Sequence, residues 1–270
     1  MTDAEVHWHA AEDRGLGWAR ARLPLERCAL ETLLARISRV RPLPAKLAAL
    51  DIGCGCGTLL AAMAERGIRA FGVDASRAAA ATARRLAAER QLEAPIILGE
   101  GERLACREGQ FDLVIARSVL EHADDPYRLA AEAFRVLRPG GVLYAHTTNA
   151  LCPKQNEIRG YPCFSWYPGG LKRRLMMEAR DQGSARIGGT QRPALYWFTP
   201  GRARRLLAAA GFGQVFDRWQ LASAHDLPRS LRALAFALRL LRWSSPLRLA
   251  ADVFREGSWY LAVKGKAGDG

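Results

Sequence analysis

Leu-Asp-Ile-Gly-Cys-Gly-Cys-Gly-Thr-Leu-Leu, residues 50–60, is the stretch that decides the fold. Residues 47–52, apolar apart from Asp51, have the composition of a short buried parallel strand. Residues 58–65 have helical composition, so a helix is expected to open at Thr58. Between strand and helix, three glycines alternate with small residues: Gly53, Gly55 and Gly57. Glycine accepts positive φ and lets a ligand approach the backbone closely. A strand, a glycine loop and a helix place a polar ligand at the carboxyl end of a parallel strand.

The identity of that ligand is the first question that the loop raises. A dinucleotide fingerprint needs its third glycine at position 58, where this chain has Thr58. An adenosyl sulfonium carries no pyrophosphate but has an amine, a carboxylate and a ribose. Asp51 could organise its amino-acid end, and loop N–H groups could meet its carboxylate. The alternative is a purely structural glycine turn in some other α/β protein.

Strand and helix patterns alternate through the rest of the first half. Acidic or turn residues separate them, as Asp74 does after the second strand. This alternation predicts an α/β fold, a Rossmann-like three-layer sandwich with a parallel sheet between helices. The expected strands are residues 69–73, 95–98, 111–116 and 142–147, the expected helices are 75–90 and 126–137, and a turn is expected at 139–141.

Several junctions resemble the motifs of class I S-adenosylmethionine-dependent methyltransferases, in order and spacing. Residues 50–60 resemble motif I, and Asp74 ends the second strand as in that family. Gly-Glu-Gly-Glu-Arg-Leu, residues 99–104, is similar to the family's Gly-Asp-Ala-Glu-x-Leu segment. Residues 111–116 look like motif II, and Arg-Val-Leu-Arg-Pro-Gly-Gly, residues 135–141, looks like the motif that follows it. The resemblance covers about residues 45–150.

The resemblance implies a methyltransferase that uses S-adenosylmethionine and releases S-adenosylhomocysteine. It also implies a seven-stranded, mostly parallel sheet that ends in an antiparallel hairpin. Asp74 would accept the ribose hydroxyls, although Asp is also a favoured helix N-cap. Glu100 would meet the adenine amine, or else be a solvated loop residue. The candidate cofactor-binding residues are Asp51, Gly53, Cys54, Gly55, Gly57, Asp74, Ala75, Glu100, Gly101, Glu102 and Arg117.

His122 is the candidate catalytic base. It follows the fourth expected strand, and the pKa of an ordinary histidine lies near neutrality. Leu-Glu-His, residues 120–122, resembles the ubiquinone-pathway O-methyltransferases, in which an upstream glutamate joins the Glu-His pair as a divalent-metal site. Ser118 stands at that upstream position here, so no metal site is predicted. The alternative for His122 is a structural role under the cofactor or at a helix cap.

The chain is divided into four parts around this core. Residues 1–45 form an N-terminal helical segment that packs on the sheet edge or covers the cofactor, and residues 46–150 form the cofactor-binding core. Residues 151–198 form an acceptor-side lid, whose aromatic residues make either a pocket for a flat acceptor or a small satellite core. Residues 199–270 complete the sheet: a helix opens at Pro200, strands lie at 214–221 and 259–264, and a basic helix is inserted at 229–250.

Charge is distributed unevenly along the chain. The net charge is +13; residues 1–150 hold 20 Lys+Arg against 19 Asp+Glu, and residues 151–270 hold 20 against 8. A basic surface attracts phosphates, acidic small molecules or anionic membranes. Peripheral membrane contact through the helix at 229–250 is one expectation, and simple coverage of the sheet is the other. An arginine-rich composition alone would also give this charge.

We therefore expect O-methylation of a small or lipid-linked acceptor that is anionic in one version of the hypothesis. An RNA methyltransferase is the first alternative, which lacks support from an Asn/Asp-Pro-Pro-Tyr-type motif, and a non-catalytic scaffold with this fold is the second. Residues 1–20 are polar and charged, with no apolar signal segment, and no apolar run reaches the roughly 18 residues of a membrane span. The expected location is the cytoplasm, with the six cysteines as free thiols.

Overall fold

The computed structural model describes residues 12–155, 157–181, 192–223 and 240–265. Seven strands form one sheet in the order β3-β2-β1-β4-β5-β7-β6. β1 to β5 are parallel, and β7 runs antiparallel to both β5 and β6. The predicted mostly parallel sheet with a terminal antiparallel hairpin is confirmed. The strands are β1 Ala48–Ile52, β2 Arg69–Asp74, β3 Ile96–Leu98, β4 Phe111–Arg117, β5 Leu137–Thr148, β6 Gln214–Asp217 and β7 Gly257–Val263.

The strand order reverses between β1 and β4, which creates a crevice at their carboxyl ends. From β1 the chain moves outward to β2 and β3, and it then returns to the other side of β1 as β4 and β5. The loops that leave β1 and β4 therefore diverge to opposite sides of the sheet. Open α/β sheets bind their ligands at such a point.

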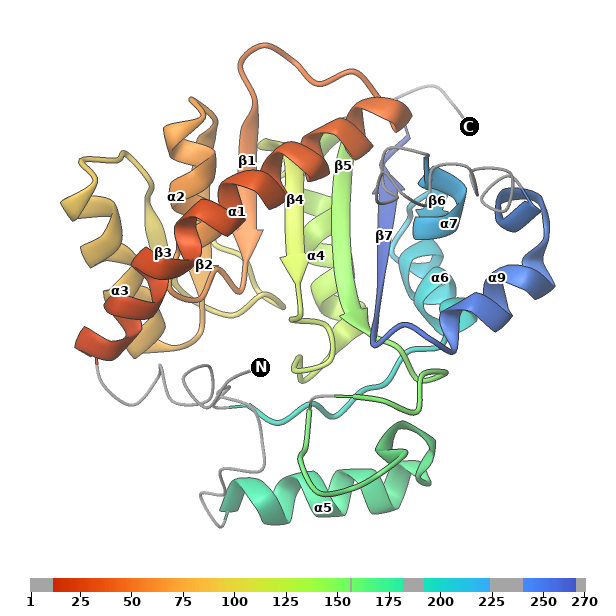
Figure 1. Ribbon diagram of the computed structural model, residues 1–270. Coiled ribbons are helices and arrows are strands. Elements are labelled where there is room, and N and C mark those ends of the chain that lie inside the picture. Colours follow the sequence, from red (N-terminus) through yellow and green to blue (C-terminus); the bar gives the residue numbers. More distant parts are fainter. Residues whose placement is uncertain (1–11, 156, 182–191, 224–239, 266–270) are drawn as a thin grey trace.

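Helices cover both faces of the sheet and bury two separate apolar cores (Figure 1). Three helices pack on one face: α1 Glu12–Val40, α2 Thr58–Glu65 and α3 Arg77–Glu89. Two pack on the other: α4 Pro126–Val136 and α6 Pro200–Ala209. This is the three-layer arrangement that the alternation of strand and helix patterns predicted.

α1 lies across a face of the sheet, which differs from the expected position at its edge. It crosses in front of β1, β4 and β5 (Figure 1) and packs on α2 and α3. Its buried side chains recur at helical spacing: Leu16, Ala19, Leu23, Leu30, Leu33 and Ile37. Arg20 pairs with Glu89 of α3 at 2.7 Å, and Arg27 pairs with Glu65 of α2 at 2.7 Å. The apolar stripe is long enough to need a face rather than an edge.

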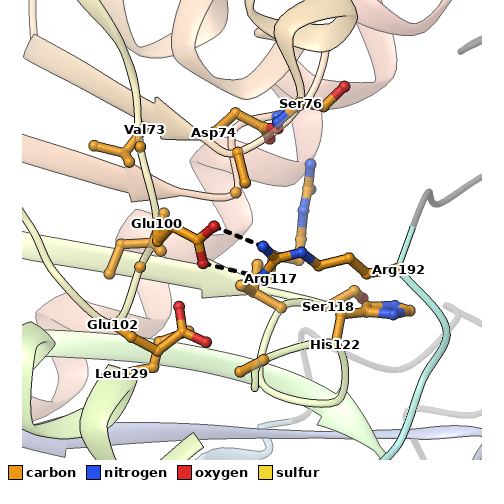
Figure 2. Close-up of a pocket in the computed structure, with 18 residues that line it drawn as sticks. Val73, Asp74, Ser76, Glu100, Glu102, Arg117, Ser118, His122, Leu129 and Arg192 are labelled. Carbon is orange, nitrogen blue, oxygen red and sulfur yellow. Dashed lines mark hydrogen bonds and ion pairs between the residues drawn. The ribbon is translucent and has the colours of Figure 1, made fainter. Parts of the chain in front are cut away.

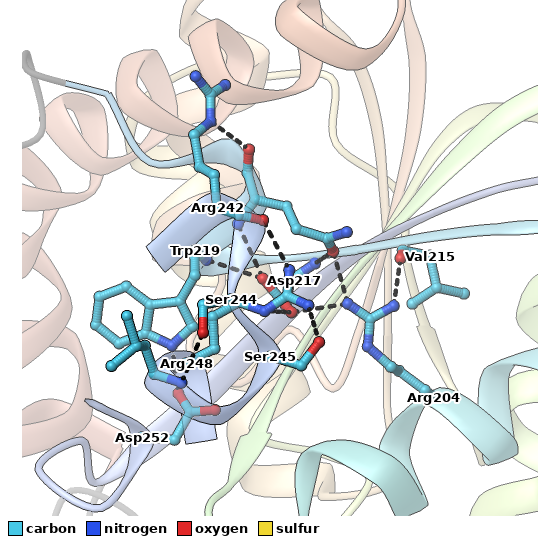
Figure 3. A network of polar contacts seen from close by, with 11 residues as sticks. Arg204, Val215, Asp217, Trp219, Arg242, Ser244, Ser245, Arg248 and Asp252 are labelled. Atoms are coloured by element: carbon cyan, nitrogen blue, oxygen red, sulfur yellow. Dashed lines mark hydrogen bonds and ion pairs between the residues drawn. The ribbon is translucent and has the colours of Figure 1, made fainter. Parts of the chain in front are cut away.

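The predicted strand at 214–221 is too long, because a helix begins inside it. β6 stops at Asp217, and α7 spans Arg218–Leu221. The Asp217 carboxylate accepts hydrogen bonds from the backbone N–H groups of Trp219 and Gln220, and the Gln220 side chain accepts one from the N–H of Asp217. This is a capping box, which starts a helix. Arg204 of α6 braces it by donating to Asp217 at 2.7 Å (Figure 3).

The basic helix predicted at 229–250 is interrupted. Residues 224–239 lie outside the described part of the chain, residues 240–243 are helical, and α9 spans Ser245–Asp252. The break occurs because the Ser244 side chain accepts a hydrogen bond from the N–H of Leu247 and caps a new helix, with Pro246 in its first turn. In the described residues no helix has the length and apolar character that crossing a membrane requires.

The segment at 151–198 lies beyond the carboxyl ends of β4 and β5, on the expected acceptor side (Figure 1). It contains a short 3₁₀ helix, Phe164–Trp166, and α5, Gly169–Asp181. Its aromatic residues pack on each other: Phe164 is fully buried, and its ring lies 5.5 Å from that of Trp197. Of the two interpretations of this cluster, the structure supports the satellite core.

Candidate functional site

A cavity of about 420 Å³ lies at the carboxyl ends of β1, β2 and β4 (Figure 2). Loops after these strands and after β3 supply its walls. Nine of the twelve candidate site residues border it: Gly53, Gly55, Asp74, Ala75, Glu100, Gly101, Glu102, Arg117 and His122. The structure therefore gathers residues spread over 70 positions of sequence at one edge of the sheet.

Three candidates do not border the cavity: Asp51, Cys54 and Gly57. Cys54 is buried in the core shared with α1, α2 and α3, so its side chain belongs to the packing under the loop. Gly57 is the N-cap of α2, and a Cβ there would lie 2.8 Å from the Cβ of Ala83 in α3. Its role is close packing of helix on helix.

Asp51 is 4% exposed and lies below the cavity floor rather than in its wall. Burial raises the pKa of its carboxyl to about 7; the positive charge of Arg117 opposes this, and the negative charges of Glu26 and Asp74 add to it. Asp51 therefore acts on the cavity through charge and through its neighbours. The direct contact with a cofactor amine that the sequence suggested is not provided by this geometry.

The glycine loop has the backbone conformation that was expected of it. Gly53, Gly55 and Gly57 have φ values of 68°, 55° and 73°. A Cβ on Gly53 would collide with the Val119 side chain, which follows β4. The loop after β1 thus approaches the loop after β4 more closely than any residue with a side chain would allow.

Asp74 ties the glycine loop to the end of β2 and also faces the cavity. Its Oδ2 accepts a hydrogen bond from the N–H of Gly55 at 2.8 Å, and its Oδ1 accepts one from the N–H of Ser76 at 2.8 Å. Each carboxylate oxygen can accept a second hydrogen bond. The helix that follows is capped by Ser76, whose side chain accepts from the N–H of Ala79, so Asp74 is not the N-cap.

Glu100 is engaged by an arginine that the sequence did not single out. Arg192 donates from Nη2 to Oε1 at 2.6 Å and from Nη1 to Oε2 at 3.1 Å, and Figure 2 shows the guanidinium meeting the carboxylate inside the cavity. Arg192 also borders the cavity and lies 3.6 Å from Asp124. Glu102 accepts a hydrogen bond from the N–H of Asp124 at 2.9 Å. An adenine amine at Glu100 would share that carboxylate with Arg192.

Arg117 is the last residue of β4 and is held from α1. Its Nη1 donates to Oε2 of Glu26 at 2.7 Å, and Arg22 donates to the other oxygen at 3.2 Å. Glu26 is only 2% exposed. Burial opposes its ionisation, but the hydrogen bonds and charges of Arg117 and Arg22 outweigh burial, so the pKa of Glu26 lies below its ordinary value. No motif pointed to this pair.

His122 borders the cavity beside the end of β4. Its Nδ1 is buried and has no hydrogen-bond partner in the described residues. Burial lowers the pKa of the imidazole, against the charge of Glu157 and the backbone of Arg192 and Pro193. The ring is therefore neutral at neutral pH, with a nitrogen able to accept a proton.

Glu121, next to His122, points into the protein. It is 2% exposed and accepts a hydrogen bond from Thr147 Oγ1 at 2.8 Å. Burial raises its pKa to about 7. Within the ranges that the structure describes, no group of three or more His, Cys, Asp and Glu side chains is arranged to hold a metal ion.

Comparisons with known proteins match this core. A family described as "Methyltransferase domain" matches residues 50–145. The ubiquinone biosynthesis O-methyltransferase of Pseudomonas aeruginosa is 38% identical over 105 residues, which cover 37% of this chain and 44% of that protein. The enzyme of the same name from Caulobacter vibrioides is 36% identical over 104 residues, covering 38% and 41%. The chain thus spans less than half the length of these curated relatives.

Solved structures share the fold over most of the chain. An S-adenosylmethionine-dependent methyltransferase from Mesorhizobium loti superposes with a TM-score of 0.53 at 19% identity, covering 82% of this chain and 93% of that one. Phosphoethanolamine N-methyltransferase 2 of Haemonchus contortus, in complex with S-adenosyl-L-methionine, gives 0.54 at 18% identity, covering 87% and 53%. Identities this low establish the architecture alone.

Proposed function

We propose, on the premise that residues 50–145 form a class I S-adenosylmethionine-dependent methyltransferase domain, that the protein transfers a methyl group to an oxygen atom of a small or lipid-linked acceptor. The observation that carries the proposal is the cavity of about 420 Å³ with Asp74 in its wall, at the point where the strand order reverses. Small-molecule sites span about 300–1,000 Å³. The names of the curated relatives support oxygen as the acceptor atom.

The residues around the cavity fit an adenosyl amino acid. The free acceptor capacity of Asp74 suits vicinal ribose hydroxyls, and Glu100 would take the adenine amine in exchange for part of its contact with Arg192. Gly53 leaves space against the backbone at the centre of the site. The buried carboxyl of Asp51 and the guanidinium of Arg117 surround the amino-acid end with paired charge.

The sulfonium cofactor, when bound, supplies the reactive methyl carbon. The protein must exclude water and align an acceptor oxygen opposite the departing sulfur. His122 is placed to accept the hydroxyl proton, because its imidazole is neutral and borders the cavity beside the end of β4. The segment at 151–198, which lies over this edge, would close the acceptor side.

Titration calorimetry with S-adenosylhomocysteine tests the cofactor assignment. Wild-type protein should bind one molecule, and Asp74→Asn should weaken binding by about tenfold or more, since it removes charge-assisted hydrogen bonds. Asp125→Asn is the matched control: Asp125 is the exposed N-cap of α4, and Asn caps a helix equally well. If wild-type protein does not bind, the non-catalytic scaffold becomes the better explanation.

His122→Ala tests the base. Turnover should fall by about 10²-fold or more, while the affinity for S-adenosylhomocysteine stays within a few fold. Near-normal turnover would leave His122 a structural residue. An affinity for RNA that falls steeply with salt would favour the RNA methyltransferase alternative. The cytoplasmic location stays a prediction.

A further inference from the structure

A second cavity, of about 220 Å³, lies between α1 and the carboxyl-terminal half of the sheet. Thr32 and Arg36 of α1, Leu59 of α2, Arg117 of β4 and Tyr144 of β5 border it. Arg117 also borders the cofactor cavity, so this one side chain separates the two spaces. The second cavity is therefore adjacent to the edge of the sheet where the proposed chemistry occurs.

Positive charge converges on this second cavity. Three arginines lie near enough to the Tyr144 hydroxyl to act on its pKa, which burial raises and which Arg117, Arg36 and Arg218 pull down. Arg218 comes from α7, where the capping box of Asp217 fixes the start of the helix. Its Nε is buried and lacks a hydrogen-bond partner in the described residues. Burial, followed by the charge of Arg255, lowers the pKa of Arg218.

The nearby carboxylates do not balance these arginines. Glu26 is shared between Arg117 and Arg22. Asp51 has a pKa of about 7 and is therefore partly protonated at neutral pH. Asp252 accepts a hydrogen bond from the indole of Trp219 and, like Asp51, has a pKa that burial raises. A buried excess of guanidinium charge is costly unless an anion compensates it.

We infer that this second cavity binds a carboxylate or phosphate group of the methyl acceptor. Guanidinium groups bind these oxyanions through paired hydrogen bonds, and a phenol hydroxyl adds a further donor. Because Ser118 and Val119 follow Arg117 into the wall of the cofactor cavity, an anion held here would place the rest of the acceptor beside the reacting edge. This selects acidic acceptors, and the inference rests on the proposed methyl transfer.

Arg36→Gln separates this inference from the cofactor assignment, because Arg36 borders only the second of these two cavities. The probe is inorganic phosphate, titrated by calorimetry at constant ionic strength into protein saturated with S-adenosylhomocysteine. Wild-type protein should bind phosphate saturably, and Arg36→Gln should bind it about tenfold more weakly or worse, as expected for loss of a charged hydrogen-bond partner. Arg36→Lys, which keeps the charge without the fork, should lie between.

Arg173→Gln is the charge-matched control, since Arg173 is exposed on α5 and should leave phosphate affinity unchanged. Affinity for S-adenosylhomocysteine should be the same in all four proteins. Non-saturable phosphate binding, or equal phosphate affinity in wild-type protein and Arg36→Gln, would overturn the inference. So would a loss of S-adenosylhomocysteine affinity in Arg36→Gln, which would assign the second cavity to the cofactor carboxylate. Failure of the wild-type protein to bind S-adenosylhomocysteine would instead reject the proposed function.

Discussion

Glu26→Gln should remove the buried ion pair that joins α1 to the end of β4. Glu26 has a side chain only 3% exposed, and its Oε2 lies 2.7 Å from Nη1 of Arg117. The substitution keeps the shape of the side chain and deletes its charge. It leaves Arg117 between two cavities without its principal counter-charge.

The size of the effect follows from the exposure of the two partners. Breaking a fully buried ion pair costs about 3–5 kcal/mol. The Arg117 side chain is 36% exposed, so water screens part of the lost interaction. We therefore expect the free energy of unfolding at pH 7 to fall by about 1–3 kcal/mol.

The same pair should give the effect a definite pH dependence. The pKa of Glu26 is lowered in the folded protein from its ordinary value of 4.5, so the folded state favours the ionised form. The stabilisation is fully present above pH 4.5 and is lost as the pH falls through the lower, folded-state pKa. The stability difference between wild-type protein and Glu26→Gln should therefore shrink below pH 4.5.

Urea denaturation of both proteins from pH 3.5 to pH 8 measures this difference. Glu31→Gln is the matched control on the same helix, because the Arg66–Glu31 pair has the same chemistry with both side chains 58% exposed. It should change the free energy of unfolding by less than about 0.5 kcal/mol. Equal effects of the two substitutions, or a Glu26→Gln effect that does not vary with pH, would refute the reasoning.

Three further substitutions test other parts of the site. Gly53→Ala should lower the free energy of unfolding by about 1–3 kcal/mol and weaken S-adenosylhomocysteine binding, because the left-handed backbone and the lack of space both oppose a side chain; unchanged urea midpoint and affinity would show that the loop relaxes. Arg192→Ala should tighten S-adenosylhomocysteine binding by releasing Glu100, and should change stability by less than about 1 kcal/mol because both side chains are more than a third exposed; weaker binding in calorimetry would mean that Arg192 itself contacts the cofactor. Asp217→Ala should cost about 1–2 kcal/mol through loss of the α7 cap and of the contact with Arg204, measured by urea denaturation against Asp217→Asn, which keeps the cap; equal losses would argue against capping.

The sequence was sufficient for the core of the fold because its signals there are local. The run that ends at Ile52, the glycines after it and the acid at Asp74 each specify a strand end or a turn within a few residues. Their positions on one edge of the sheet then follow from parallel strand order. The same locality explains why nine candidate residues border one cavity.

The errors in the second half came from helix-start signals that were present but were not used. Asp217 and Gln220 have the spacing of a capping box, and Ser244 precedes Pro246, yet apolar periodicity alone extended the strand and the basic helix across them. Capping competes with periodicity over a single turn. The side chain at one position therefore decided where each element ended.

The ion pairs of the site could not be predicted, because nothing local specifies them. Glu26 and Arg117 are 91 residues apart, and Glu100 and Arg192 are 92 residues apart. In a chain with 35 arginines, most positions offer a guanidinium, and only the packing of α1 and of the end of the 151–198 segment selects the partner. The placement of α1 across the face also depends on this packing.

A crystal structure of the protein with S-adenosylhomocysteine tests the central claim most directly. The account predicts both ribose hydroxyls within hydrogen-bonding distance of the Asp74 carboxylate, about 2.5–3.0 Å, and the adenine amine beside Glu100. The ligand bound elsewhere, or bound in the cavity with its ribose away from Asp74, would contradict it.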